Sequence, residues 1–141
     1  IAYVRQCQNP DGGFSYMLQG GGGGSAFPRS AAGVAALYYA GVFEGDDIKR
    51  GLDYIRRFTP GKFRDTANAH YYYGQYYAVQ AMFLAGGDYW GEWYPAIRDT
   101  LLARQTGDGS FGDTEVCAEF GTAMACIILQ MPNNFLPIFT P

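Results

Sequence analysis

The densest group of side chains that could contribute to chemistry begins at the chain's only histidine, His70, and continues into a run of tyrosines. Three of these tyrosines and a glutamine fall at helical spacing on one face: Tyr73, Tyr76, Tyr77 and Gln80. The π-face of each ring can attract a cation, an interaction that contributes about 0.5–2 kcal/mol. The phenol hydroxyls suit sugars and other polar ligands equally well. Core packing, with the hydroxyls bonded to neighbouring turns, is the structural alternative.

A second candidate group could bind an anion. The low-complexity segment Gly20–Gly24 precedes Arg29, and successive backbone N–H groups in such a segment can form an anion-binding nest. No Lys-Ser/Thr pair follows the glycines, so a nucleotide-binding loop is not supported. A flexible surface loop is the structural alternative. Arg29 therefore joins the candidate ligand-binding residues.

Two pairs of carboxylates have to be considered as catalytic groups. Glu115 and Glu119 lie one helical turn apart, and glycoside hydrolysis needs two carboxyls about 5–9.5 Å apart. Because helical barrels host glycosidases, a carbohydrate-active α/α barrel is one alternative function. Asp46 and Asp47 are adjacent, but they precede an apolar-periodic segment, which favours a role in capping a helix.

The elements that must position these residues repeat along the chain. The segment from Gln8 to Phe14, QNPDGGF, returns from Gln105 to Phe111 as QTGDGSF. A degraded copy, RFTPGKF, lies midway between them. The period is about 48 residues, and periods of about 20–50 residues indicate repeat arrays.

The spacing of apolar residues between these turns predicts helices. Glycines or a glutamine stand at the expected helix ends, and capping residues at several expected starts. We expect helices from Ser30 to Gly41, from Asp46 or Asp47 through Ile55, from about Asn68 to Gly86, from a first turn containing Pro95 to about Gln105, and from about Thr114 to Gln130, with the end of another before Gln8.

These helices alternate in composition. The first, third and fifth are rich in alanine, glycine and aromatic residues nearly all round, whereas the second and fourth carry a charged stripe. A helix that is apolar all round is buried, and a helix with a charged stripe faces water. The sequence therefore predicts an all-α single domain, 1–141, of inner–outer helical hairpins with repeats at roughly 1–58, 59–105 and 106–141.

The turn between an outer and an inner helix resembles the Gln–Trp repeat of the squalene cyclase and protein prenyltransferase superfamily. Phe14 and Phe111 stand where that family commonly has Trp, and the resemblance covers almost the whole chain. It implies an α/α toroid, in which six inner helices lie inside six outer ones. The three hairpins here would form about half of it, the C-terminal half.

The resemblance also implies a function. It predicts an aromatic concave surface for an apolar or isoprenoid-like small molecule, or for a peptide, without complete catalytic machinery in this fragment. A zinc-dependent prenyltransferase-like or cyclase-like enzyme in an intact protein is the alternative. Protein prenyltransferases hold zinc with Asp, His and Cys side chains at the beginnings of inner helices, a ligand set that suits catalytic zinc. By this resemblance the candidate metal ligands are Asp65, His70, Asp113 and Cys117, although that family's spacing is not reproduced.

Composition limits the remaining function classes. Of 141 residues, 48% are hydrophobic and 16% charged, with a net charge of −3, so we expect a packed core and no nucleic-acid partner. The sequence contains no uninterrupted apolar run of about 18 residues, so no transmembrane helix is expected. The start at Ile1 has no signal-peptide pattern, so no compartment is indicated, and it suggests a piece of a longer protein. Because a half-ring leaves its edge hairpins without neighbours, we expect self-association through them.

Overall fold

The computed structural model of the chain describes residues 1–18, 23–62, 70–112 and 116–134. These residues form six α-helices, one short 3-10 helix and no β-strand, which confirms the all-α class for this part of the chain. The elements are α1 (Ala2–Gln6), α2 (Phe27–Tyr39), α3 (Asp46–Arg56), α4 (Tyr71–Ala85), α5 (Gly87–Arg104), α6 (Ala118–Leu129) and η1 (Met131–Asn133).

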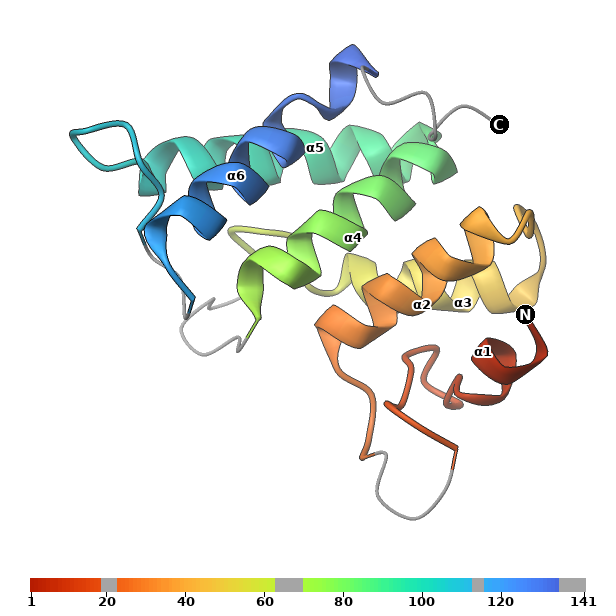
Figure 1. Cartoon of the computed structure of the whole chain (residues 1–141). Helices are drawn as coiled ribbons and strands as arrows, with labels where there is room; N and C mark the ends of the chain where they lie inside the picture. The colour runs from red at the N-terminus through yellow and green to blue at the C-terminus, as the bar shows by residue number, and fades with distance from the viewer. Residues whose placement is uncertain (19–22, 63–69, 113–115, 135–141) are drawn as a thin grey trace.

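The larger helices form two layers (Figure 1). In the front layer α2, α4 and α6 lie side by side, with their N-termini at the same end. In the back layer α3 and α5 run in the opposite direction. The central helix is α4, which contacts α2, α3, α5 and α6. Each of the hairpins α2–α3 and α4–α5 therefore pairs one front helix with one back helix.

The two layers differ in charge, as the alternating composition predicts. The charged residues of the front helices are Arg29 and Glu119, and α4 has none. The back helices carry acidic and basic residues along their length, in the sequences DDIKRGLDYIR and GDYWGEWYPAIRDTLLAR. Since charged side chains remain hydrated, α3 and α5 turn these residues to water.

The start of α2 corrects one prediction. The helix begins at Phe27 and not at Ser30, because Pro28 supplies the φ angle of a first helical turn. Ser30 lies inside the helix, where its hydroxyl donates to the carbonyl oxygen of Ala26 (2.7 Å). The predicted stop is confirmed, since the helix ends at Tyr39, just before Gly41.

The start of α5 corrects a second prediction. Pro95 lies in the interior of this helix and not in its first turn, because the helix already begins at Gly87. A proline at this position cannot donate to the carbonyl of Gly91. Gly91 is exposed, so water can bond to that carbonyl and the helix continues.

The start of α6 is later than predicted. Cys117 has extended backbone angles and the helix begins at Ala118, whereas the predicted start, Thr114, lies outside the described residues. Asn68, the predicted start of the third helix, also lies outside them, and α4 begins at Tyr71.

The first copy of the repeated turn is closed by its own side chains. Gln8 Nε2 donates to the carbonyl oxygens of Gly12 (3.0 Å) and Asp47 (2.8 Å), and so joins the turn to the start of α3. Asp11 Oδ1 accepts a hydrogen bond from the backbone N–H of Gly13 (3.0 Å). Gly12 has φ +90°, a conformation that favours glycine.

The second copy reproduces these bonds. Gln105 Nε2 donates to the carbonyl oxygen of Gly109 (2.9 Å), and Asp108 Oδ1 accepts from the backbone N–H of Ser110 (3.0 Å). Gly109 has φ +85°. Unlike Gln8, Gln105 bonds to no further helix among the described residues. The sequence repeat is thus a structural repeat, and its Gln and Asp are structural groups.

The aromatic residue that ends each turn anchors the following front helix. Phe14 and Phe111 are 2% and 3% exposed. Their backbone N–H groups donate to hydroxyl oxygens one turn into the next front helix, Ser30 Oγ in α2 (2.8 Å) and Thr122 Oγ1 in α6 (3.1 Å). Each turn therefore fixes both the depth and the rotation of the helix after it.

The degraded third copy keeps part of this geometry. Gly61 has φ +77°, and Lys62 N–H donates to the carbonyl oxygen of Thr59 (3.1 Å). Thr59 is 1% exposed and takes no part in an Asp-Gly turn. The final ring of this copy, Phe63, lies outside the described residues.

Polar contacts join successive back elements. Arg5 of α1 pairs with Asp47 of α3 (Nε to Oδ2, 2.7 Å), and Arg56 of α3 pairs with Glu92 of α5 (Nε to Oε2, 3.0 Å). In both cases an arginine near the end of one element meets a carboxylate in the early part of the next. Similar ion pairs therefore join α1 to α3 and α3 to α5.

The layers meet in an aromatic core. Phe27 of α2 lies 5.3 Å from Phe58 and 6.0 Å from Trp93 of α5, between ring centroids. Gly74 of α4 lies against Phe27, and a Cβ added there would be 2.7 Å from Cε1 of that ring. The absence of a side chain at Gly74 therefore allows α4 to approach α2 closely.

Alanine substitutions at the two turn glycines separate backbone strain from close packing. Both Gly12→Ala and Gly109→Ala place a side chain at positive φ, which costs about 1–2 kcal/mol. The new Cβ would lie 2.3 Å from the carbonyl oxygen of Arg50 at position 12, whereas its nearest neighbour at position 109 is 3.8 Å away. We expect Gly12→Ala to lower the free energy of unfolding clearly more than Gly109→Ala in urea denaturation. Equal losses would show that the approach to Arg50 is unimportant.

The second turn also predicts a response to acid. Hydrogen bonds from the Thr106 hydroxyl and from the N–H and hydroxyl of Ser110 lower the pKa of Asp108 to about 2. A folded-state pKa below the unfolded value stabilises the fold above about pH 4, and this contribution is lost as the pH falls toward about 2. Asp108→Asn keeps an acceptor without a charge, so its unfolding free energy should fall less over this range. Identical pH profiles would contradict the assignment.

Candidate functional site

The three predicted tyrosines form a ridge on α4. Tyr73 is 42% exposed, and Tyr76 and Tyr77 are half-buried. The ring centroids of Tyr73 and Tyr77 are 4.9 Å apart, as are those of Tyr76 and Tyr77, and both pairs meet edge to face. This arrangement of rings is favourable. We call Tyr73, Tyr76 and Tyr77 the tyrosine ridge.

Gln80 ties the ridge to α2. Its side chain is 1% exposed, and its Nε2 donates to the carbonyl oxygen of Tyr76 (2.6 Å). Its Oε1 accepts a hydrogen bond from the hydroxyl of Tyr39, in the last turn of α2. Tyr39 is 47% exposed and lies outside the predicted set. The signal that could have found it is the Tyr38-Tyr39 pair at the end of a helix, since neighbouring residues point about 100° apart and only one of the two faces the core here.

The phenols of Tyr39 and Tyr73 are difficult to ionise. Burial raises the pKa of Tyr39 well above its usual range, and the neighbouring phenols of Tyr76 and Tyr77 raise it further. Burial also raises the pKa of Tyr73, with smaller contributions from Tyr77 and Tyr16. The surface therefore stays uncharged at neutral pH while it offers hydroxyl groups.

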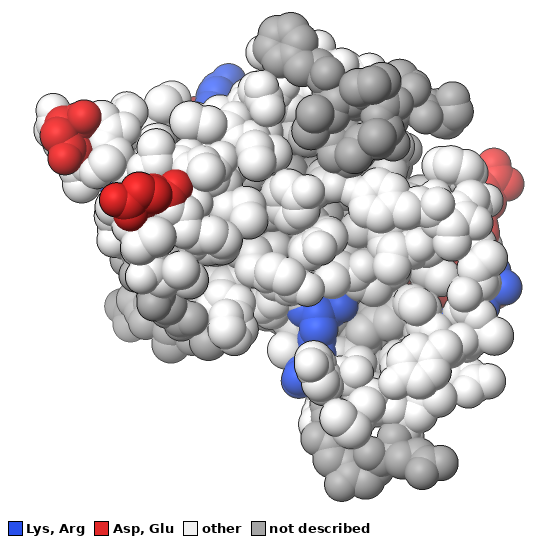
Figure 2. Space-filling view, viewed as in Figure 1, with Lys and Arg blue, Asp and Glu red and all other residues white. Residues whose placement is uncertain are grey.

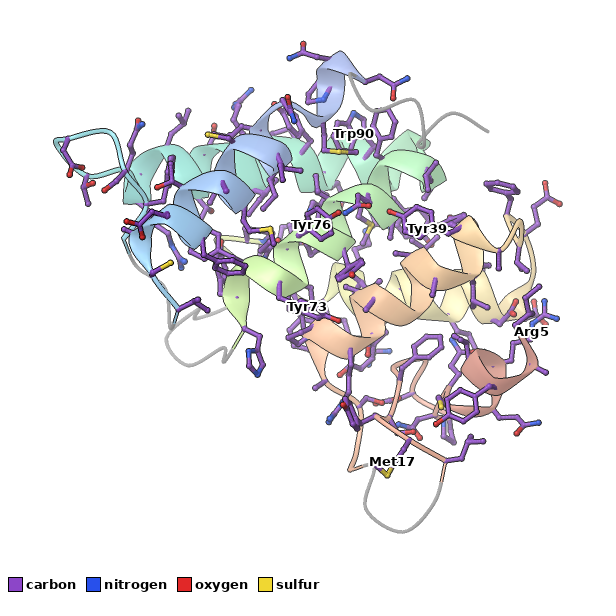
Figure 3. All side chains as sticks on the ribbon, in the orientation of Figure 1. Arg5, Met17, Tyr39, Tyr73, Tyr76 and Trp90 are labelled. Carbon is purple, nitrogen blue, oxygen red and sulfur yellow. The ribbon has the colours of Figure 1, made fainter. Side chains whose placement is uncertain are left out.

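The ridge lies between α2 and α4 on the front of the molecule. Figure 3 shows Tyr39, Tyr73 and Tyr76 along the line where these helices meet. Small side chains flank it on α2, where Ala36 lies one turn before Tyr39 and is exposed. Figure 2 shows few charged side chains on this face, most of them toward its edges, with one basic group just below its middle. An apolar molecule would thus meet rings and hydroxyls there.

Two other predicted ligand-binding residues lie where the front helices begin. Arg29 is half-buried, its Nη2 donates to the carbonyl oxygen of Gly24 (2.6 Å), and its Nε is buried without a hydrogen-bond partner. His70 is exposed and precedes α4 with φ +68°, a left-handed conformation that His adopts more readily than most residues. Arg29 lies ten residues before Tyr39, and His70 lies ten residues before Gln80. Ten residues of helix span about 15 Å along the axis. The predicted ligand-binding residues therefore extend along the front layer and do not form one small pocket.

The predicted metal ligands are described only in part. His70 and Cys117 immediately precede the adjacent helices α4 and α6, and the Cys117 thiol is exposed and not in a disulfide. Asp65 and Asp113 lie outside the described residues. Within the residues that are described, no three or more His, Cys, Asp or Glu side chains form a group that could hold a metal ion. The zinc site stays a prediction.

The glutamate pair proposed for glycoside hydrolysis is likewise incomplete. Glu115 lies outside the described residues, and Glu119 is exposed in the first turn of α6. Hydrogen bonds from its own backbone N–H and from the Cys117 thiol lower the pKa of Glu119. A general acid at neutral pH needs a raised pKa, so Glu119 does not suit that role.

No protein-family model, curated protein or solved structure matches this chain. The resemblance to the squalene cyclase and prenyltransferase repeat thus rests on the turn motifs. Across the described ranges, no helix is long and apolar enough to cross a membrane.

The bond between Tyr39 and Gln80 can be tested by removing one hydroxyl. Tyr39→Phe leaves the buried Gln80 Oε1 without its donor, which should lower the free energy of unfolding by about 1–3 kcal/mol. Because the folded-state pKa of Tyr39 is raised, the variant should also lose less stability than the parent as the pH rises above about 10. Urea denaturation measures both effects. Tyr3→Phe, at a residue that is 57% exposed on α1, is the control and should change stability by less than about 0.5 kcal/mol.

Proposed function

We propose that this chain is a helical-repeat binding module that presents the tyrosine ridge, with Tyr39 and Gln80, to an elongated apolar ligand of isoprenoid-like character. The observation that carries the proposal is the exposure of the rings. Tyr39 and Tyr73 keep 47% and 42% of their surface in water, although burying a tyrosine is favourable. Rings that served the core alone would be buried, as Tyr72 is (2%).

The chemistry of the ridge supports a neutral ligand. Hydrocarbon chains gain about 25 cal/mol for each Å² of apolar surface removed from water, and aromatic rings offer large apolar areas. The absence of charge on α4 avoids the cost of burying an ionised group under such a ligand. The phenol hydroxyls can bond to a terminal hydroxyl of the ligand. Peptides and sugars are the competing ligands, because both also use tyrosine surfaces.

We further propose that the two layers are part of an α/α toroid of the squalene cyclase and prenyltransferase kind, with α2, α4 and α6 as inner helices. The common direction of these helices and the repeated turns support this arrangement. So does the difference between the two glutamines. Gln8 bonds to the next back helix, whereas Gln105, among the described residues, bonds only within its turn. A further hairpin, from the same polypeptide or from a second copy, would complete the contact at Gln105.

A binding titration with farnesol, an isoprenoid alcohol, tests the proposed ligand class. We expect saturable quenching of the intrinsic fluorescence, since the rings would lie against the chain of the alcohol. Tyr73→Ala and Tyr76→Ala should each weaken binding roughly tenfold, the loss typical of a tyrosine at the centre of an interface. Tyr3→Ala is the matched control and should bind as the parent does.

Two results of the same titrations would contradict the proposal. Farnesol binding that is unchanged in both ridge variants would remove the ridge as the site. Binding of a proline-rich peptide or a cello-oligosaccharide in place of farnesol, lost in Tyr73→Ala, would keep the ridge and overturn the isoprenoid class.

A further inference from the structure

A recess lies at the end of the layers where α2 and α4 end and α3 and α5 begin. Its volume is about 630 Å³, within the range of small-molecule sites, about 300–1,000 Å³. Its lining is part apolar and part polar: Tyr38, Phe43, Leu52, Leu84 and Tyr89 supply aromatic and aliphatic surface, and Glu44, Asp46 and Lys49 supply charged groups. The recess is distinct from the tyrosine ridge because Tyr38 and Tyr39 point to different sides of α2, the first into the core and the second to solvent.

Tyr38 gives this recess a hydroxyl group that no protein group occupies among the described residues. The residue is 3% exposed, and its ring lies 5.8 Å from that of Phe43, between centroids. Its hydroxyl has no hydrogen bond to any residue that the structure describes, although Tyr38 lines the recess. Burial raises the pKa of Tyr38 to about 12, so the hydroxyl keeps its proton at neutral pH. The hydroxyl is not among the fully buried polar atoms, so it faces the recess, where water or a ligand atom can bond to it.

Among the described residues, the charged groups at the recess include more acidic than basic side chains without an ion-pair partner. Lys49 lines it but is already paired with Asp53 (Nζ to Oδ2, 2.6 Å), and Asp53 also accepts a hydrogen bond from the Tyr89 hydroxyl (2.6 Å). Glu44 and Asp46 line it too, and neither carboxylate is ion-paired within the described residues. The uncompensated charge at the opening is therefore negative.

We propose that this recess binds a small organic cation with an apolar body, of the arylalkyl ammonium class. The body would pack among Phe43, Leu84 and the ring of Tyr38, and the ammonium would lie toward Glu44 and Asp46. Aromatic walls favour such a cation, since their π-faces attract positive charge. The same two carboxylates repel an anion of equal size, so the site discriminates by charge.

Phenethylammonium is the probe, with phenethyl alcohol and hydrocinnamate as neutral and anionic probes of similar size. Binding is followed by amide chemical shifts in two-dimensional NMR, at low salt. We expect saturable shifts at the recess with phenethylammonium, weaker shifts with the alcohol and none with hydrocinnamate at the same concentrations. Hydrocinnamate binding as tight as that of phenethylammonium, or the absence of saturable shifts with any probe, would overturn the proposal.

Three variants locate the probe. Glu44→Gln combined with Asp46→Asn should weaken phenethylammonium binding by about three- to tenfold and leave the alcohol unaffected, because only the charge is removed. Tyr38→Phe should weaken the binding of both probes, because it removes the hydroxyl that can bond to the polar group of either one. Tyr3→Phe, at an exposed residue of α1, is the control and should change neither. Binding that is insensitive to both the carboxylate variant and Tyr38→Phe, or that is weakened as much in Tyr3→Phe, would overturn the assignment.

Discussion

The positions of α2 and α6 depend on a glutamine amide that closes the turn before each of them. A helix end leaves backbone carbonyl and N–H groups without partners, and a turn between layers must supply them. In both described copies the amide reaches across the turn to the carbonyl of a glycine at positive φ, and the aspartate bonds two residues ahead. The ring that follows can then enter the core at a fixed depth.

This constraint explains how much of the fold could be predicted. Gln, Asp-Gly and an aromatic ring have specific conformational demands, so the turns and the hairpin order were readable from the sequence. The starts of α2 and α5 were harder to predict, because Ser30 and Pro95 do not have the roles at a helix start that their residue types favour. The Ser30 hydroxyl serves as the acceptor for Phe14 N–H and lies inside the helix, and Pro95 is tolerated where the carbonyl of Gly91 meets water.

The candidate site, too, could be predicted only in part. The helical spacing of Tyr73, Tyr76 and Tyr77 sufficed to group them, because that grouping is local to α4. Tyr39 belongs with them only because α2 packs on α4 and brings its hydroxyl to Gln80. The recess at the other end has lining residues from two helix ends and two helix beginnings, a combination that follows from the packing of the layers and leaves no pattern along the chain.

The central place of α4 has a consequence for cooperativity. In many linear repeat arrays each unit carries enough polar surface to detach from one end, so unfolding proceeds as fraying. Here the middle helix has no charged residue and contacts both of its front neighbours and both back helices. Loss of either neighbouring hairpin would expose an uncharged, largely apolar helix to water. We therefore expect the hairpins to unfold together and the amides of α4 to exchange most slowly.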